Sequence, residues 1–136
     1  MNIDKFKHDH VTILGNVNDL RRLVQAGVAD NGDAIARMIV SMSSTIKLHL
    51  ASEDRVLYPS LIASSSSVAA QAAKKFQTEM GAIAAAYAEF SRKWNLASKV
   101  VASPDEFRQE AGAIFKALHE RIQSENTALY PLAEHA

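Results

Sequence analysis

The sequence of 136 residues contains no cysteine. Disulfide bonds, thiolate catalysis and cysteine-ligated zinc or iron–sulfur sites are therefore excluded, and any bound metal must depend on imidazole and carboxylate ligands. The net charge is zero, because 15 basic residues balance 15 acidic ones. This balance, with no basic stripe among aromatics, predicts no nucleic-acid partner. No apolar run is long enough for a membrane span and no signal peptide is recognisable, so we expect no membrane partner and a cytoplasmic location.

Proline and glycine are scarce, with three and five residues, so the breaks between segments stand out. Turn residues occur at Asp30-Asn31-Gly32, a short serine run at 64–67, and a helix start at Ser103-Pro104-Asp105-Glu106. These breaks predict one domain over residues 1–136. We expect its helices at 3–29, 33–62, 68–101 and 104–133.

Each of these segments carries apolar residues spaced three and four apart, the pattern of helices that pack in a bundle. The expected apolar face continues through Val56 in the second segment, through Trp94, Ala97 and Val101 in the third, and through Ala128 in the fourth. Short connections make neighbouring helices antiparallel. The sequence therefore predicts an all-α fold, an up-down-up-down four-helix bundle.

Strongly polar residues interrupt these apolar faces. Burying a charge costs several kcal/mol unless it is paired or bound to metal. With a rise of about 1.5 Å per residue, residues from three different helices fall at one height in the bundle. We therefore expect a common polar layer, formed by His10, His49, Glu53, Arg121 and Glu125.

The ends of the second and fourth segments repeat each other. Residues 49–59 (HLASEDRVLYP) align without gaps on residues 121–131 (RIQSENTALYP), and the Ser, Glu, Leu, Tyr and Pro positions are identical. The Leu-Tyr-Pro endings are expected to stop or kink each helix. A repeated half-site on two helices of a bundle is a common way to assemble a carboxylate-bridged metal centre.

Over essentially its whole length the sequence resembles the hemerythrin-like, or HHE cation-binding, family. Three motifs carry the resemblance: Asp9-His10-Val11-Thr12-Ile13 in the first helix, His49 and Glu53 with Leu57-Tyr58-Pro59 in the second, and Glu125 with Leu129-Tyr130-Pro131 in the fourth. The resemblance implies a hemerythrin-like bundle with a non-haem metal site between its helices.

Two positions depart from the family pattern. In that family the first- and second-helix histidines hold one metal, the third- and fourth-helix histidines hold another, and two carboxylates bridge them. Met80 and Arg121 stand where the resemblance places the third- and fourth-helix histidines. The ligands of one metal remain, and they are His10, His49, Glu53 and Glu125. We expect about one ion per chain, iron before manganese or zinc.

The resemblance implies a protein that handles or senses iron, dioxygen or another small oxidant. We identify no catalytic residues, and a non-enzymatic role is favoured. The alternative is a metal-free interaction or regulatory module, in which Arg121 replaces a missing cation and donates hydrogen bonds to one or both of Glu53 and Glu125. If Arg121 instead extends outward, the two carboxylates are left to bind metal unaided.

The remaining polar candidates are given structural roles. His8 and His119 are expected to face solvent, and His135 lies in the C-terminal tail. Tyr87 is expected in the core, with its hydroxyl bonded to a buried acceptor. Glu79 is expected to be solvated.

Overall fold

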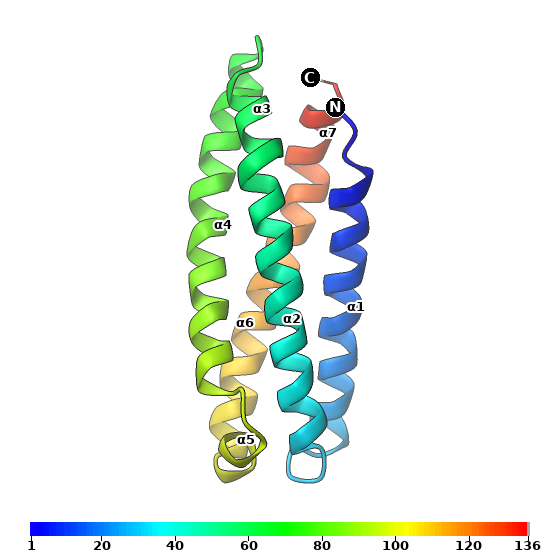
Figure 1. Cartoon of the computed structure of the whole chain (residues 1–136), viewed down its shortest axis with the longest axis vertical. Coiled ribbons are helices and arrows are strands. Elements are labelled where there is room, and N and C mark those ends of the chain that lie inside the picture. The colour runs from blue at the N-terminus through cyan, green and yellow to red at the C-terminus, as the bar shows by residue number, and fades with distance from the viewer. Residues whose placement is uncertain (136) are drawn as a thin grey trace.

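The structure is a computed structural model and describes residues 1–135. Four long helices lie side by side (Figure 1), and the all-α bundle predicted from the sequence is confirmed. They are α1 (Asp4–Ala26), α2 (Gly32–Ser52), α4 (Ser67–Lys93) and α6 (Pro104–Ser124). The chain reverses between consecutive long helices. The N-terminus, the α3–α4 connection and α7 lie at one end of the bundle, and the α1–α2 turn and α5 lie at the other.

The third helix was predicted to run unbroken from 68 to 101, and this prediction is wrong. α4 ends at Lys93, and a short helix, α5 (Ala97–Ala102), follows after a break. Trp94 is buried at the break, and its indole N–H donates to Glu110 of α6 at 3.2 Å. α5 packs against the start of α2. Val100 is consequently buried in place of the expected Val101, which is exposed.

The second and fourth helices each contain one wide π-helical turn just before a proline. These turns are η1 (Glu53–Leu57) and η2 (Glu125–Leu129), and they lead into α3 (Tyr58–Ile62) and α7 (Tyr130–Glu134). The Tyr58 amide donates to the Glu53 carbonyl, five residues back. A proline ring crowds the carbonyl four residues before it, and a wider turn relieves that contact. The Leu-Tyr-Pro endings therefore widen the helices without stopping them.

The extra residue in each π-turn rotates the following side chains by about 100° around the helix. The apolar face predicted from the sequence is therefore wrong after Glu53 in the second helix and after Glu125 in the fourth. Val56 is 51% exposed and Leu57 is fully buried. In the fourth helix Ala128 is exposed, and Leu129 and Tyr130 are buried.

Buried apolar residues form two clusters along the bundle. The larger one fills the half that contains the α1–α2 turn and includes Leu20, Ile39 and Phe115. The smaller one fills the opposite end and includes Phe6, Leu61 and Leu129. The buried histidines and glutamates are not part of either cluster. Along each helix their positions fall between the two, so the polar residues form a layer that separates two apolar cores.

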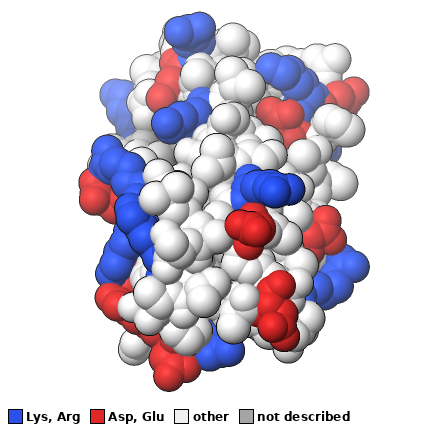
Figure 2. All heavy atoms as spheres, turned by 60° about the horizontal axis from the view of Figure 1, so that its bottom comes forward, with Lys and Arg blue, Asp and Glu red and all other residues white. Residues whose placement is uncertain are grey.

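Apart from the glutamates of the polar layer and Arg121, most charged side chains lie at the surface, where the two signs are mixed. Figure 2 shows basic and acidic side chains interspersed on the face that includes the α5 end of the bundle. Within residues 1–135, none of the helices combines the length and the apolar character needed to cross a membrane.

Candidate metal site

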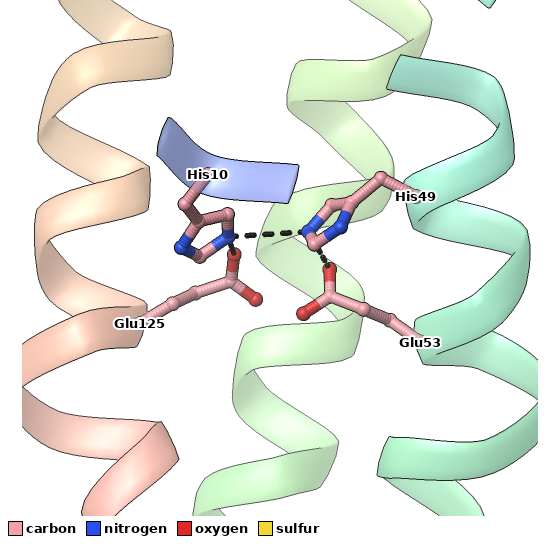
Figure 3. Close-up of side chains that lie close together, drawn as sticks. All are labelled: His10, His49, Glu53 and Glu125. Carbon is pink, nitrogen blue, oxygen red and sulfur yellow. Dashed lines mark hydrogen bonds and ion pairs between the residues drawn. The ribbon is translucent and has the colours of Figure 1, made fainter. Parts of the chain in front are cut away.

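The polar layer brings together the four residues predicted as metal ligands. His10 comes from α1, His49 from the last turn of α2, and Glu53 and Glu125 from the first position of each π-turn. Each side chain is at most 1% exposed. One nitrogen or oxygen atom from each lies within 4.8 Å of the others, and the four point toward one another (Figure 3).

The two imidazoles meet through their Nε2 atoms, which lie 3.1 Å apart. Each Nε2 also faces a carboxylate: His10 lies 3.1 Å from Glu125 Oε1, and His49 lies 3.1 Å from Glu53 Oε1. Both rings therefore direct the same nitrogen at the centre of the cluster. Each carboxylate in turn has its Oε1 atom beside one of these nitrogens.

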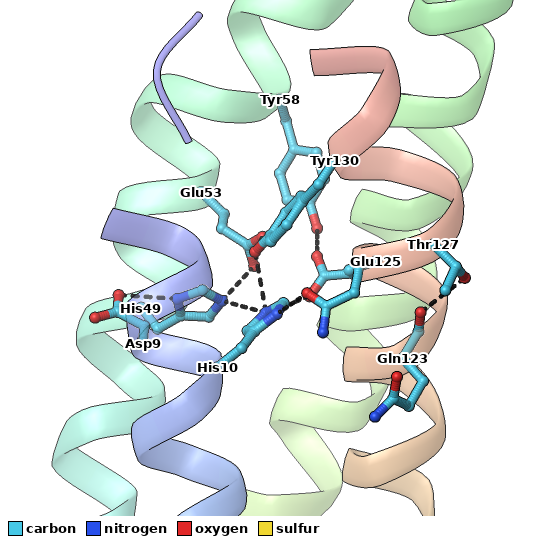
Figure 4. Close-up of polar contacts among 10 residues, drawn as sticks. Asp9, His10, His49, Glu53, Tyr58, Gln123, Glu125, Thr127 and Tyr130 are labelled. Atoms are coloured by element: carbon cyan, nitrogen blue, oxygen red, sulfur yellow. Dashed lines mark hydrogen bonds and ion pairs between the residues drawn. The ribbon is translucent and has the colours of Figure 1, made fainter. Parts of the chain in front are cut away.

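The outer nitrogens of the imidazoles are held by two polar neighbours that the sequence reading did not assign to the site. Nδ1 of His49 lies 3.0 Å from Asp9 Oδ2 (Figure 4). Nδ1 of His10 lies 2.7 Å from Asn126 Oδ1. Both oxygens are acceptors, so each Nδ1 carries the proton in these contacts. In the neutral rings each Nε2 then presents a bare lone pair to the cluster. Outer-shell contacts of this kind orient histidine ligands in metal sites.

Two tyrosine hydroxyls complete the cluster, and both come from the repeated Leu-Tyr-Pro segments. Tyr58 donates to Glu125 Oε2 at 3.1 Å, and Tyr130 donates to Glu53 Oε2 at 3.0 Å. The Tyr130 ring also stacks on the His10 ring, with centroids 4.9 Å apart. The π-turns place both tyrosines inside the bundle. The repeated sequence includes Tyr58 and Tyr130. In an uninterrupted α-helix, however, both side chains would point away from the polar layer.

The donor set fits a bound cation. Two imidazole lone pairs converge at 3.1 Å, which is unfavourable unless a proton or a cation lies between them. Glu53 Oε1 is buried and receives no hydrogen bond from residues 1–135, because its contact with His49 lacks hydrogen-bond geometry. Mixed imidazole and carboxylate ligands suit iron, manganese and zinc.

Without metal, protons must compensate for this concentration of acceptors. Burial and the nearby charge of Glu125 raise the pKa of Glu53 to about 8, against the opposing effect of His49. Burial alone would lower the pKa of His49, but the close contact with the Glu53 carboxylate and the hydrogen bond to Asp9 outweigh it and raise that pKa to about 8. Burial would likewise raise the pKa of Glu125, but its contacts with His10 and Glu53 hold that pKa below the usual value.

Arg121 does not join this cluster, and the predicted hydrogen bonds from Arg121 to Glu53 and Glu125 are wrong. Its guanidinium pairs with Glu79 of α4 at 2.5 Å and stacks on the Phe76 ring at 4.3 Å. Glu79, expected to be solvated, is therefore a half-exposed ion-pair partner. An arginine side chain is long enough to leave the layer in which its own Cα lies.

Other polar candidates take the structural roles expected of them. His8, His119 and His135 are exposed. Tyr87 is buried, and its hydroxyl donates to the Ile39 carbonyl at 2.9 Å. Met80 is buried.

The sequence model of the hemerythrin HHE cation-binding domain matches residues 1–133 of this chain. The chain belongs to the hemerythrin HHE cation-binding family. Comparisons with curated proteins and with solved structures returned no match. Membership of this family indicates metal binding, and the buried cluster of the HHE domain is a group that could hold a metal ion.

Proposed function

We propose that the protein binds one divalent metal ion per chain, iron foremost, through His10, His49, Glu53 and Glu125. The observation that supports this most strongly is that one nitrogen or oxygen atom from each of these four side chains lies within 4.8 Å of the others, in a site closed to solvent. Two imidazoles and two carboxylates leave open coordination positions on iron, with manganese and zinc as competitors.

The surroundings of the two carboxylates favour one ion over two. In a two-metal centre each bridging carboxylate gives one oxygen to each metal. Here the Oε2 atoms of Glu53 and Glu125 accept hydrogen bonds from tyrosine hydroxyls. Arg121 and Met80 stand in place of the second metal's imidazoles, so a second ion lacks both its nitrogen ligands and its carboxylate oxygens.

Bound iron would supply a redox couple and an open position for dioxygen or another small oxidant. The chain's own residues define what can reach it. All four proposed ligands are buried, and apolar clusters lie on both sides of the layer. Only a small molecule fits such surroundings, and within residues 1–135 no further group of three or more metal-ligating side chains lies beside it. We therefore assign the protein to iron, dioxygen or oxidant handling or sensing rather than to enzymatic turnover of an organic substrate.

Stoichiometry tests this proposal. Protein prepared without a histidine tag is loaded anaerobically with Fe(II), freed of unbound metal, and assayed for iron and protein. We expect about one iron per chain, because the chain provides one set of two imidazole and two carboxylate ligands. Two tightly held irons, with the visible bands of an oxo-bridged pair after oxidation, would contradict the one-ion site. No retained metal of any kind would favour the metal-free module.

A further inference from the structure

The two buried carboxylates use their oxygens in the same way. Glu125 directs Oε1 at His10 Nε2, 3.1 Å away, and its Oε2 accepts from Tyr58 at 3.1 Å. Glu53 directs Oε1 at His49 Nε2, 3.1 Å away, and its Oε2 accepts from Tyr130 at 3.0 Å. In each carboxylate one oxygen therefore faces the imidazoles, and the other is held by a phenol.

These hydrogen bonds cross between the two halves of the site (Figure 4). Tyr58 follows Glu53 in the sequence but donates to Glu125, and Tyr130 follows Glu125 but donates to Glu53. Each tyrosine begins the helix that follows a π-turn, so its direction is fixed by that turn. Both hydroxyls are buried with their rings. The crossed pairs tie the end of the second helix to the end of the fourth.

A carboxylate can bind a metal through one oxygen or through both. To chelate through both, Glu53 or Glu125 would have to withdraw Oε2 from its tyrosine. The Tyr58 hydroxyl would then be buried without an acceptor, and the Tyr130 hydroxyl would keep only His10 Nε2, 3.0 Å away, which is itself a proposed ligand atom. We propose that Tyr58 and Tyr130 are positioning residues that restrict each carboxylate to one metal-facing oxygen. They thereby limit the number of ligand atoms that the site gives to the ion. This inference rests on the proposed metal site.

The limit on ligand atoms is also a basis for selecting the metal. Ions that accept few ligands, such as Zn(II), tolerate two carboxylates that each offer one oxygen. Ions with higher coordination numbers and a preference for oxygen, such as Mn(II), gain most when a second oxygen becomes free. Removal of the two hydroxyls should therefore shift the preference of the site from zinc toward manganese.

Cobalt(II) is a suitable probe, because its visible absorption per ion weakens as its coordination number rises. The experiment compares wild type, Tyr58→Phe, Tyr130→Phe and the double variant. Tyr87→Phe is the matched control, since Tyr87 is equally buried but donates to the Ile39 carbonyl away from the site. All are loaded with one equivalent of Co(II), and folding is checked by circular dichroism.

We expect a loss of visible intensity per bound cobalt in each single variant and a larger loss in the double variant. The ratio of Mn(II) to Zn(II) affinity should rise in the same order, and Tyr87→Phe should match wild type in both measurements. Folded Tyr58→Phe and Tyr130→Phe proteins that bind cobalt with the wild-type spectrum would overturn the positioning role. Each single variant tests the role separately, so the test does not depend on the double variant folding. A wild-type protein that binds no cobalt would overturn the metal site itself, and with it this inference.

Discussion

Nδ1 of His49 donates to Asp9 Oδ2 across the α1–α2 interface, at 3.0 Å. Asp9 is the residue before His10, so α1 supplies both a proposed ligand and the residue that orients a ligand on α2. The contact keeps the proton on Nδ1 and leaves Nε2 of His49 for the cluster. Asp9 is 22% exposed, so its removal should disturb packing little.

We predict that Asp9→Ala lowers metal affinity by about 10- to 100-fold, the usual effect of losing an outer-shell partner of a histidine ligand. Competition with a chelator of known affinity measures the change. Asp4→Ala is the control, because Asp4 lies on the same helix and is exposed. Equal affinities for the Asp9 and Asp4 variants would show that the hydrogen bond does not orient His49.

His49→Ala should abolish tight metal binding and remove the thermal stabilisation that metal provides. A ligand present at 100 times its Kd stabilises the folded state by about 2.7 kcal/mol, so the loaded variant should melt well below loaded wild type. The metal-free proteins should differ much less. Differential scanning calorimetry with and without metal checks this. His8→Ala, on an exposed site of α1, should behave as wild type, and comparable losses for both variants would refute the ligand assignment.

The free energy of unfolding of the metal-free protein should fall as the pH rises from about 5 to 8. The pKa of Glu53 is raised from 4.5 to about 8 and that of His49 from 6.5 to about 8, so the folded state retains protons that the unfolded chain has lost. Stability from Glu53 is lost between about pH 4.5 and 8 and that from His49 between about pH 6.5 and 8. Because the two groups interact, we expect a loss on the order of 1 kcal/mol per pH unit for the pair together.

Metal binding should have the opposite dependence on pH, because it requires the deprotonated forms of Glu53 and His49. The gap in Tm between loaded and metal-free protein should therefore widen from pH 6 to pH 8. Calorimetric scans across this range measure both effects. A metal-free protein that gains stability between pH 6 and pH 8 would show that the cluster does not retain these protons.

The helices and the ligand layer could be predicted because each depends on local periodicity. Apolar residues three and four apart define the packed faces, and the rise of a helix places His10 and His49 at one height. The family motifs then identify Glu53 and Glu125 as part of the same group. The structure brings these four residues together, whereas their role as ligands stays a prediction.

Features that depend on tertiary contacts could not be predicted in this way. No strongly helix-breaking residue precedes the end of α4. The break there accompanies the burial of Trp94 and its hydrogen bond to Glu110. A proline predicts some distortion of a helix, but not that one extra residue will turn Tyr58 and Tyr130 into the cluster. Periodicity also could not predict that Arg121 pairs with Glu79, because a long side chain can reach a partner outside the layer in which its own Cα lies.

Arg121→Met should change the free energy of unfolding by less than about 1 kcal/mol and leave metal affinity unchanged. The arginine pairs with Glu79, which is 41% exposed and can be hydrated alone. Its Nε and Nη2 atoms are buried without an acceptor among residues 1–135, so methionine also removes unsatisfied donors. Urea unfolding with and without metal measures both quantities.

Glu79→Gln provides the comparison for this prediction. It should destabilise the protein more than Arg121→Met, because it leaves a mostly buried guanidinium, 12% exposed, without its carboxylate. A loss of about 3–5 kcal/mol for Arg121→Met in the metal-free protein would instead indicate that Arg121 neutralises a buried carboxylate of the cluster.

The contacts of His10 determine when the proposed site can exist during protein synthesis. His10 meets Glu125, Asn126 and Tyr130 across sequence separations of 115, 116 and 120 residues. A nascent chain that has been translated only as far as Ser124 lacks all three partners, and therefore half of the carboxylate ligands. The complete set of proposed ligands therefore exists only once residues 125–130 have been synthesised, so a bound ion would stabilise the assembled bundle rather than its first two helices alone.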